Sequence, residues 1–178
     1  MNQSKEVWEW IRSIAVAVLL ALVIRFFLLE VFVVEGRSMY PTLEDYNRVV
    51  VNKIIYRFEE PQPGDIVVFE YEPSRDFIKR VIGVGGDTIE IRDGVVYRNG
   101  EALNEPYLLD GMDQQPSFGP VEVPPGTLFL MGDYRHNSLD SRDPRVGFVP
   151  LEKIKGRAFL VFWPPGEARI LDHKVEQQ

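Results

Sequence analysis

The sequence predicts a mainly β domain of antiparallel strands, preceded by one long apolar helix. Three observations support this prediction. The only long apolar stretch lies before residue 30, the later apolar segments are short and rich in β-branched residues, and the 13 prolines fall mostly between those segments. A chain of 178 residues is long enough for one domain with a modest core.

The apolar stretch is typical of a membrane anchor, which we place at residues 11–29 as a single transmembrane helix. At about 1.5 Å per residue, a helix of this length matches a hydrocarbon core of roughly 30 Å. Arg12 and Arg25 fall near its ends, where long side chains reach the interface. Trp8 and Trp10 suit the aromatic belt at the membrane surface.

Two other interpretations of this stretch stay open: a buried core helix and a removed signal peptide. Lys5 and Arg12 would form the charged start of a signal peptide, but residues 25–29 contain no small-residue cleavage site. We therefore expect an uncleaved anchor. Its orientation does not follow from charge, because basic residues lie on both sides of it, with Arg37 on the C-terminal side.

The β domain is expected over residues 30–178, after a short N-terminal segment at residues 1–10 and the anchor. Asp93-Gly94 and Asn99-Gly100 are hairpin turn signals. Residues 111–125 contain four prolines and are predicted to be a mobile or inserted loop. No amphipathic helix is predicted after residue 31. Strands are predicted at residues 48–52, 65–71, 77–84, 87–92, 127–131 and 157–163.

Composition excludes several kinds of chemistry. A net charge of −7 argues against nucleic acid as a partner, since phosphate binding needs a basic face. The absence of cysteine removes disulfides, thiolate nucleophiles and cysteine metal sites. His136 and His173 are the only histidines, which argues against a zinc site. We expect no metal or other cofactor, and any hydrolytic reaction needs a base other than histidine.

Ser38 is a candidate nucleophile just after the apolar stretch, within residues 36–43. Gly36 lets another backbone come close, and Pro41 fixes its own φ and keeps Tyr40 extended. Ser38 is therefore expected on a stiff, exposed turn. A serine becomes a nucleophile only beside a base, so this segment alone is a weak signal.

Lys79 is the candidate base, because it lies inside an apolar strand. Strand alternation sends Phe77, Lys79 and Val81 to one face, and Arg80 to the other. The structural alternative is a lysine that extends past the sheet edge into water. The functional interpretation is a desolvated lysine that is neutral enough to take the proton of a serine.

A third, polar segment at residues 132–142 follows directly on an apolar strand. Its structural alternative is a solvated loop with internal ion pairs. It also concentrates donors and acceptors able to support a site. Asp133 or Asp140 is placed to pair with an arginine, and Ser138 to hold a lysine amine.

In these segments the chain resembles the bacterial type I signal peptidases, a family of membrane-anchored serine endopeptidases. The resemblance covers nearly the whole chain. It rests on the anchor and on four motifs in order, at residues 38–43, 64–69, 79–87 and 132–142. It implies the two-sheet antiparallel β fold of signal peptidases and self-cleaving repressors, with an apolar face near the bilayer.

The resemblance also implies roles for individual residues. Ser38 would be the nucleophile and Lys79 the general base, with the Ser38 backbone N–H as one oxyanion donor. The supporting roles would be orientation of Lys79 by Ser138, bracing by Asp140 and Arg142, and an ion pair between Arg80 and Asp133.

Two positions depart from the family pattern. Gly36 stands where some relatives carry a serine hydroxyl as the second oxyanion donor, so a backbone N–H near Gly36 is the remaining candidate. Tyr134 replaces the asparagine of many members. We expect shallow apolar pockets for small residues one and three positions before the cut, with Val33 and Ile82 in their lining.

The partners implied are preprotein signal peptides, the lipid bilayer and nearby translocation machinery. The N-terminus would be cytoplasmic and the catalytic domain on the outer face of the cell membrane. Two other functions stay open: a self-cleaving repressor, which would carry a DNA-binding domain in place of an anchor, and a non-catalytic membrane-tethered β module.

Overall fold

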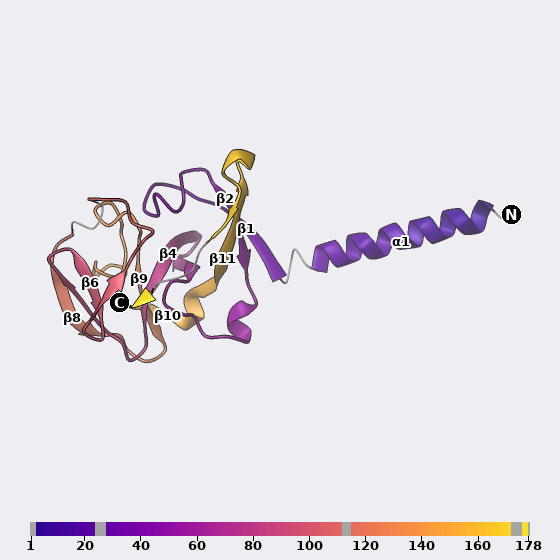
Figure 1. The fold of residues 1–178 in the computed structure, drawn as a ribbon. Helices are drawn as coiled ribbons and strands as arrows, with labels where there is room; N and C mark the ends of the chain where they lie inside the picture. Colours follow the sequence, from indigo (N-terminus) through magenta and orange to yellow (C-terminus); the bar gives the residue numbers. More distant parts are fainter. Residues whose placement is uncertain (1–2, 24–27, 112–114, 172–175, 178) are drawn as a thin grey trace.

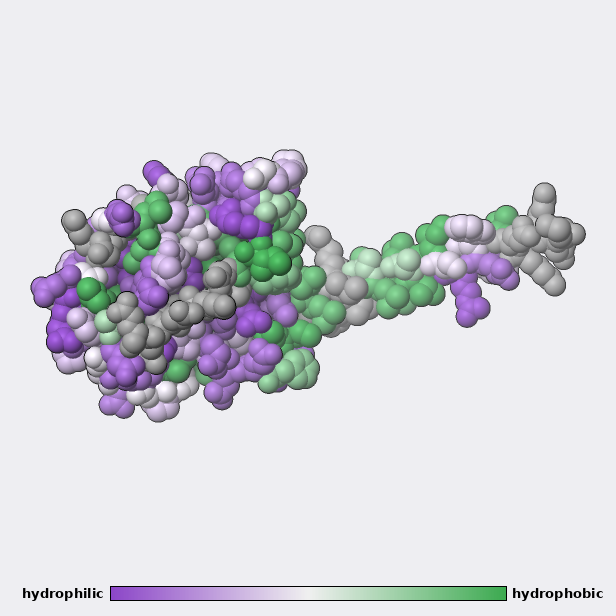
Figure 2. Space-filling model, viewed as in Figure 1, coloured by the Kyte–Doolittle hydropathy of each residue, from purple (hydrophilic) through white to green (hydrophobic). Residues whose placement is uncertain are grey.

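A computed structural model describes residues 3–23, 28–111, 115–171 and 176–177 of the chain. Helix α1 (Gln3–Val23) extends away from a β domain that contains all the strands (Figure 1). The side chains described on α1 are exposed, and hydrophobic residues follow one another along it (Figure 2). In this described part of the chain, no helix combines the length and apolarity needed to cross a membrane.

The helix differs from the predicted anchor at both ends. It begins at Gln3, well before Ile11, because the polar residues that precede the apolar stretch are also helical. The predicted last anchor residue, Leu29, is instead the first residue of a strand, since it pairs with Asn52. Residues 24–27 of the predicted anchor, including Arg25, lie outside the described residues.

The described strands form two antiparallel sheets. The larger has eight strands in the order β1-β2-β11-β3-β4-β9-β10, with β12 beside β11, and the smaller has the order β13-β7-β6-β5-β8. The strands of the larger sheet are β1 (Leu29–Val33), β2 (Arg48–Asn52), β3 (Ile66–Glu72), β4 (Arg75–Val84), β9 (Thr127–Met131), β10 (Val149–Pro150), β11 (Ile154–Trp163) and β12 (Arg169–Ile170). Those of the smaller sheet are β5 (Thr88–Arg92), β6 (Val95–Arg98), β7 (Glu101–Asn104), β8 (Phe118–Glu122) and β13 (Glu176–Gln177).

All six predicted strands are confirmed, two of them with the predicted bounds at residues 48–52 and 127–131. The hairpin signals are confirmed too. Asp93 and Gly94 both have positive φ, at 50° and 83°, as a two-residue hairpin loop requires. After residue 31 the described helices are 3₁₀ turns only: η2 (Ile55–Arg57), η3 (Leu151–Lys153) and η4 (Pro165–Glu167).

The predicted loop at residues 111–125 is partly wrong, because β8 lies inside it and pairs with β5. Gly119 and Pro120 interrupt the apolar alternation of this strand, which hides it from pattern reading. Gly119 has φ 79° and sits so close to β5 that an added Cβ would lie 2.6 Å from the Ile89 carbonyl oxygen. Residues 112–114 of this loop, and His173, lie outside the described residues.

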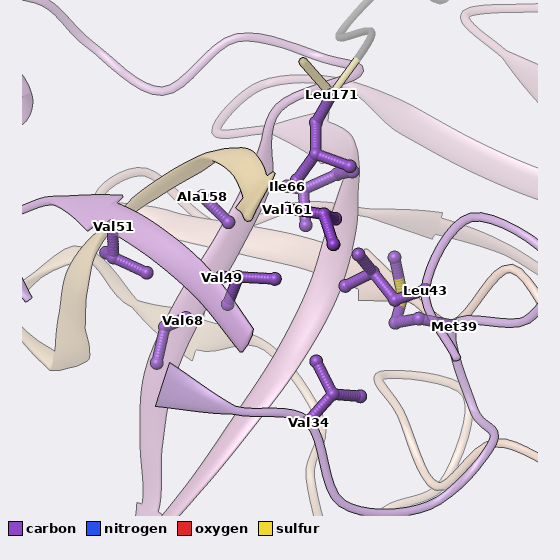
Figure 3. Packing of buried hydrophobic residues seen from close by; sticks show 10 residues of the cluster. All are labelled: Val34, Met39, Leu43, Val49, Val51, Ile66, Val68, Ala158, Val161 and Leu171. Atoms are coloured by element: carbon purple, nitrogen blue, oxygen red, sulfur yellow. The ribbon is translucent and has the colours of Figure 1, made fainter. Parts of the chain in front are cut away.

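Strand β4 connects three clusters of the hydrophobic core. Ile78 packs against the first cluster, Val81 belongs to the third, and Ile82 belongs to the second, which joins the two sheets. Both faces of β4 are therefore covered over its second half. The first cluster also takes in residues of the β1–β2 loop and comprises Val34, Met39, Leu43, Val49, Val51, Ile66, Val68, Ala158, Val161 and Leu171 (Figure 3).

One close backbone contact between strands gives a stability prediction. A Cβ added to Gly156 on β11 would lie 2.3 Å from the Asn52 carbonyl oxygen on β2. We expect Gly156→Ala to lower the free energy of unfolding by about 1–3 kcal/mol, because the two strands must separate to admit the methyl group. Urea unfolding of the detergent-solubilised protein measures this change.

Gly166→Ala is the matched control, since no atom lies within 4 Å of its added Cβ. Its free energy of unfolding should stay within about 0.5 kcal/mol of that of the wild type. Equal stability of Gly156→Ala and Gly166→Ala would contradict the close approach of β11 to β2.

Candidate active site

Ser38 lies on the loop between β1 and β2 and is held by its buried neighbours. Met39 and Leu43 insert into the first core cluster (Figure 3), and the Leu43 N–H donates to the Met39 carbonyl oxygen at 2.8 Å. Gly36, with φ 86°, makes the turn in the left-handed region that favours glycine. Ser38 itself stays half-buried, so the loop is fixed while the hydroxyl remains accessible.

Lys79 lies on β4, opposite Val67 of β3, and its side chain reaches the Ser38 loop. The residue is only 3% exposed. Its Nζ is 2.7 Å from Ser38 Oγ and donates to the Ile78 carbonyl oxygen at 3.1 Å. The amine also lies 5.1 Å from the centre of the Phe77 ring. The structure thus brings the two residues together and leaves the amine in hydrogen-bond contact with a hydroxyl.

Burial lowers the pKa of the Lys79 amine from 10.5 to about 8, because the charged form loses its hydration. The carboxylates of Asp140 and Asp133 oppose this effect, and the nearby Arg142 adds to it. A sizeable share of the amine is therefore neutral at mildly alkaline pH. A neutral amine can accept a proton, which an ordinary surface lysine seldom does in this range.

Arg80, the next residue on β4, forms a buried ion pair with Asp133. Its Nε donates to Asp133 Oδ1 at 2.9 Å and its Nη2 to Asp133 Oδ2 at 2.7 Å. Thr42 donates a further hydrogen bond to the same carboxylate, and Arg80 Nη1 donates to the Gly64 carbonyl oxygen at 3.0 Å. This pair ties the Ser38 loop and β4 to the start of the 132–142 segment.

Asp140 and Arg142 form a second pair inside that segment. Arg142 donates from Nε to Asp140 Oδ1 and from Nη2 to Asp140 Oδ2, both at 2.8 Å. The Gly132 N–H donates to Oδ2 at 3.0 Å. Although burial opposes the change, the contacts with Arg142 lower the pKa of the Asp140 carboxyl, which stays ionised.

The two carboxylates that act on Lys79 are each paired with an arginine. Asp133 and Asp140 each accept two hydrogen bonds from an arginine of their own. Arg142, the partner of Asp140, itself lowers the pKa of the Lys79 amine and so offsets part of the effect of the carboxylates. Desolvation is then the largest influence on the Lys79 amine.

Ser138 takes a different place from the one expected of a group that orients Lys79. Its Oγ is buried and lies close enough to Asp140 to help lower the pKa of that carboxyl, but it makes no well-formed hydrogen bond in the described structure. The Ile78 carbonyl oxygen holds the Lys79 amine instead. Sequence patterns did not reveal this contact, because any residue supplies a backbone carbonyl.

The backbone donors near Ser38 differ in their availability. The Gly36 N–H donates to Asp45 Oδ1 at 2.8 Å, so the candidate second oxyanion donor is engaged elsewhere in this structure. The Ser38 N–H has no protein acceptor among the described residues. The Ser38 carbonyl accepts from the Tyr134 N–H at 3.0 Å, which fixes the peptide on the other side of the serine.

A groove of about 490 Å³ opens beside Ser38 and Lys79. Val33 lines it, whereas Ile82 does not, which corrects that assignment. Ile82 is fully buried in the second core cluster, because strand alternation turns it toward the small sheet. The apolar lining includes Phe32, Val33, Val34, Val68, Phe77, Ile78 and Leu139.

The aromatic departure Tyr134 packs edge-to-face with Tyr40, with ring centres 6.3 Å apart. His136 is exposed, and its Nε2 lies 3.1 Å from the Gly111 carbonyl oxygen. No hydrogen bond joins His136 to Ser38 or Lys79 within the described residues.

Comparison with known proteins gives a consistent answer. Residues 7–163 match the family described as signal peptidase, peptidase S26. A signal peptidase I of Bacillus amyloliquefaciens is 43% identical over 172 residues, covering 92% of this chain and 89% of that protein. Signal peptidase I T of Bacillus subtilis (strain 168) is 44% identical over 170 residues, covering 90% and 88%.

A more distant relative and one solved structure carry related names. Probable signal peptidase I-1 of Synechocystis is 42% identical over 170 residues, covering 88% of this chain and 85% of that protein. The crystal structure of a signal peptidase I from Enterococcus faecalis V583 has 31% sequence identity and a TM-score of 0.46, covering 56% of this chain and 97% of that chain.

The family match spans most of the chain, and the relatives align over nearly their whole length at about 40% identity or more. This result decides against both alternatives that the sequence left open, a self-cleaving repressor and a non-catalytic β module. The chain belongs to the signal peptidase family, peptidase S26, and is a serine peptidase.

Proposed function

We propose that this chain is a membrane-bound serine endopeptidase that removes N-terminal signal peptides from secreted preproteins with a Ser38–Lys79 dyad. The observation that carries the dyad is the 2.7 Å contact between Lys79 Nζ and Ser38 Oγ. The names of the relatives, signal peptidase I, supply the substrate class.

In the proposed reaction, the neutral Lys79 amine takes the proton of Ser38 Oγ as that oxygen attacks the scissile carbonyl. The Ser38 backbone N–H is the available donor to the developing oxyanion, a role worth about 3–4 kcal/mol per donor in well-studied enzymes. The Lys79 ammonium then gives its proton to the departing amine, which leaves an acyl-enzyme. Lys79 next deprotonates a water, whose attack releases the signal peptide and restores Ser38.

The supporting residues act on the two members of the dyad. Arg80 with Asp133, and Arg142 with Asp140, hold the surrounding loops, and Arg142 helps to keep the Lys79 amine neutral. Ser138 is proposed to orient Lys79 during the reaction, which requires its hydroxyl to turn from Asp140 toward the amine. The Ile78 carbonyl supports the amine in the resting arrangement.

The groove supports a substrate with small side chains before the cut. It passes both Ser38 and Lys79, its volume is about 490 Å³, and its lining combines apolar side chains with polar ones. An extended peptide places alternate side chains against the same wall, so residues one and three positions before the cut meet this lining. Val33 and Phe77 are proposed to limit their size.

Membrane attachment is proposed through α1. The exposed apolar side chains of α1 support this proposal, because such a surface is costly in water and stable in lipid (Figure 2). The N-terminus is proposed to be cytoplasmic and the β domain on the outer face of the cell membrane. There it meets preproteins as they leave the translocation machinery.

Removing either member of the dyad should abolish cleavage without unfolding the protein. We expect Ser38→Ala and Lys79→Met each to lower the single-turnover cleavage of a preprotein by at least about 10³-fold. The double variant should be no slower than either single one, because nucleophile and base act as one unit.

Lys155→Met is the matched control, since Lys155 also lies on a strand of the large sheet but pairs with Asp76. It should cleave at nearly the wild-type rate. A Lys79→Met rate within about tenfold of wild type, in a protein with the wild-type unfolding midpoint, would exclude the dyad.

The pH dependence should follow the Lys79 amine. Below its pKa the amine is protonated and cannot take the serine proton, so kcat/KM should rise as the pH increases through about 8. The profile of His136→Gln should coincide with that of wild type. A controlling limb near about 6.5, the usual pKa of histidine, that disappears in His136→Gln would contradict this assignment.

The proposed topology predicts which face of the membrane exposes the β domain to an added protease. In sealed inside-out vesicles, whose outer surface is cytoplasmic, the β domain should resist digestion until detergent opens the membrane. Digestion of the β domain in intact vesicles would show the reverse orientation. Release of the whole chain by alkaline carbonate would show that it is not anchored in the bilayer.

A further inference from the structure

A polar cluster, half-buried at two residues and buried at the third, connects the small sheet to the candidate active site. It consists of Glu105 and Tyr107, which follow β7, and Arg135 in the 132–142 segment. The Tyr107 hydroxyl donates to Glu105 Oε1 at 2.6 Å. Arg135 donates to the same carboxylate through Nη1 at 3.0 Å and also through Nη2. We call these three residues the Tyr107 cluster.

The cluster meets the base strand through Tyr107. The guanidinium carbon of Arg80 lies 3.7 Å from the centre of the Tyr107 ring, so the ring covers one face of the guanidinium. Arg80 lies within β4, directly after Lys79. The edge of the same guanidinium is held by Asp133, so Arg80 is fixed on its edge and on its face.

The cluster meets the nucleophile through Arg135. Arg135 Nε donates to the Gly132 carbonyl oxygen at 3.1 Å, and the Arg135 carbonyl accepts from Arg142 Nη2 at 2.9 Å. Between these two contacts, the Tyr134 N–H donates to the Ser38 carbonyl oxygen. The backbone that holds Ser38 is therefore itself held at both ends by contacts of Arg135.

The members of the cluster depend on one another for charge and hydrogen bonding. Burial raises the pKa of the Tyr107 hydroxyl well above its usual value, so it remains a neutral donor to Glu105. The side chain of Arg135 is fully buried and has Glu105 as its ion-pair partner. Loss of one buried partner leaves an uncompensated polar group, which draws in water or shifts the backbone.

We propose that Glu105 and Tyr107 are positioning residues for the Ser38–Lys79 pair. The proposal rests on the proposed function, and neither residue lines the groove. They act at a distance, Tyr107 through Arg80 on β4 and Glu105 through Arg135 on the backbone beside Ser38. A site of this kind loses rate when its groups become looser, while substrate binding in the groove is retained.

A pair of substitutions at Tyr107 separates this role from simple packing. Tyr107→Leu removes the ring from the Arg80 guanidinium, whereas Tyr107→Phe keeps it. We expect Tyr107→Leu to lower kcat by at least about tenfold with KM within about twofold, and Tyr107→Phe to restore kcat to within about threefold of wild type.

The pH profile supplies a second readout. The charged groups that act on Lys79 are Asp140, Asp133 and Arg142, and all three remain in the Tyr107 variants. Loosening of β4 admits water to the amine and weakens its desolvation. The pH at which kcat/KM rises should therefore be higher in Tyr107→Leu than in wild type, and unchanged in Tyr107→Phe.

Tyr97→Leu, on β6 of the small sheet, is the matched control. The guanidinium carbon of Arg92 lies 4.0 Å from the centre of the Tyr97 ring, so this substitution breaks a similar stack away from Ser38 and Lys79. It should leave kcat and the limb unchanged. Should Tyr107→Leu not fold, Glu105→Gln keeps the shape of the side chain and should lower kcat by at least about fivefold with KM retained.

The positioning role is overturned if folded Tyr107→Leu has the wild-type kcat and the wild-type pH profile of kcat/KM. If Tyr107→Leu does not fold, the same result for Glu105→Gln overturns it. It is equally overturned if Tyr97→Leu loses as much activity. Ser38→Ala is measured in the same assay: its inactivity with an unchanged Tyr107→Leu profile rejects the positioning role alone. An active Ser38→Ala rejects the proposed dyad, and the positioning role with it.

Discussion

The site depends on one physical constraint: a lysine amine must be removed from water and must stay in hydrogen-bond contact with a hydroxyl. Lys79 meets this constraint because β4 runs between β3 and β9 and carries the amine into the protein. The Ser38 loop reaches the same place because Met39 and Leu43 are anchored in the core below it. The contact between Lys79 and Ser38 is thus set by sheet order and by the packing of residues that do no chemistry.

Two carboxylates, Asp140 and Asp133, act on Lys79 against the larger effect of burial. Each carboxylate has an arginine partner with two hydrogen bonds, Arg80 for Asp133 and Arg142 for Asp140, and Arg142 adds to the lowering of the Lys79 pKa. The same ion pairs connect the loops around the serine. The polar residues of the 132–142 segment therefore contribute both to the charges near Lys79 and to the geometry of the loops.

Much of the fold follows from local patterns. β-Branched segments and the Asp93-Gly94 turn predicted strands and a hairpin correctly, because period and turn conformation are local properties. The strand β8 was missed because Gly119 and Pro120 interrupt its pattern, and Leu29 was assigned to the helix because apolarity alone does not separate the two.

For the site, alternation says which side chains of β4 share a face, but it does not say which face remains open. Ile82 was therefore placed in the groove although it faces the small sheet. Backbone contacts cannot be predicted from side-chain patterns. No such pattern indicates that Asp45 accepts from the Gly36 N–H, or that the Ile78 carbonyl accepts from the Lys79 amine. The roles of Ser38 and Lys79 came from a resemblance over four motifs.

The most direct test of this account is the ionisation of Lys79 itself. The protein is labelled with ¹³C at lysine Cε in detergent micelles, and the Lys79 signal is identified by its absence in Lys79→Arg. Its chemical shift is then followed against pH by NMR. The midpoint is expected at about 8, because burial disfavours the cation. A Lys79 midpoint near the ordinary value of 10.5 would contradict it, since the amine would then be a charged donor at the pH of catalysis.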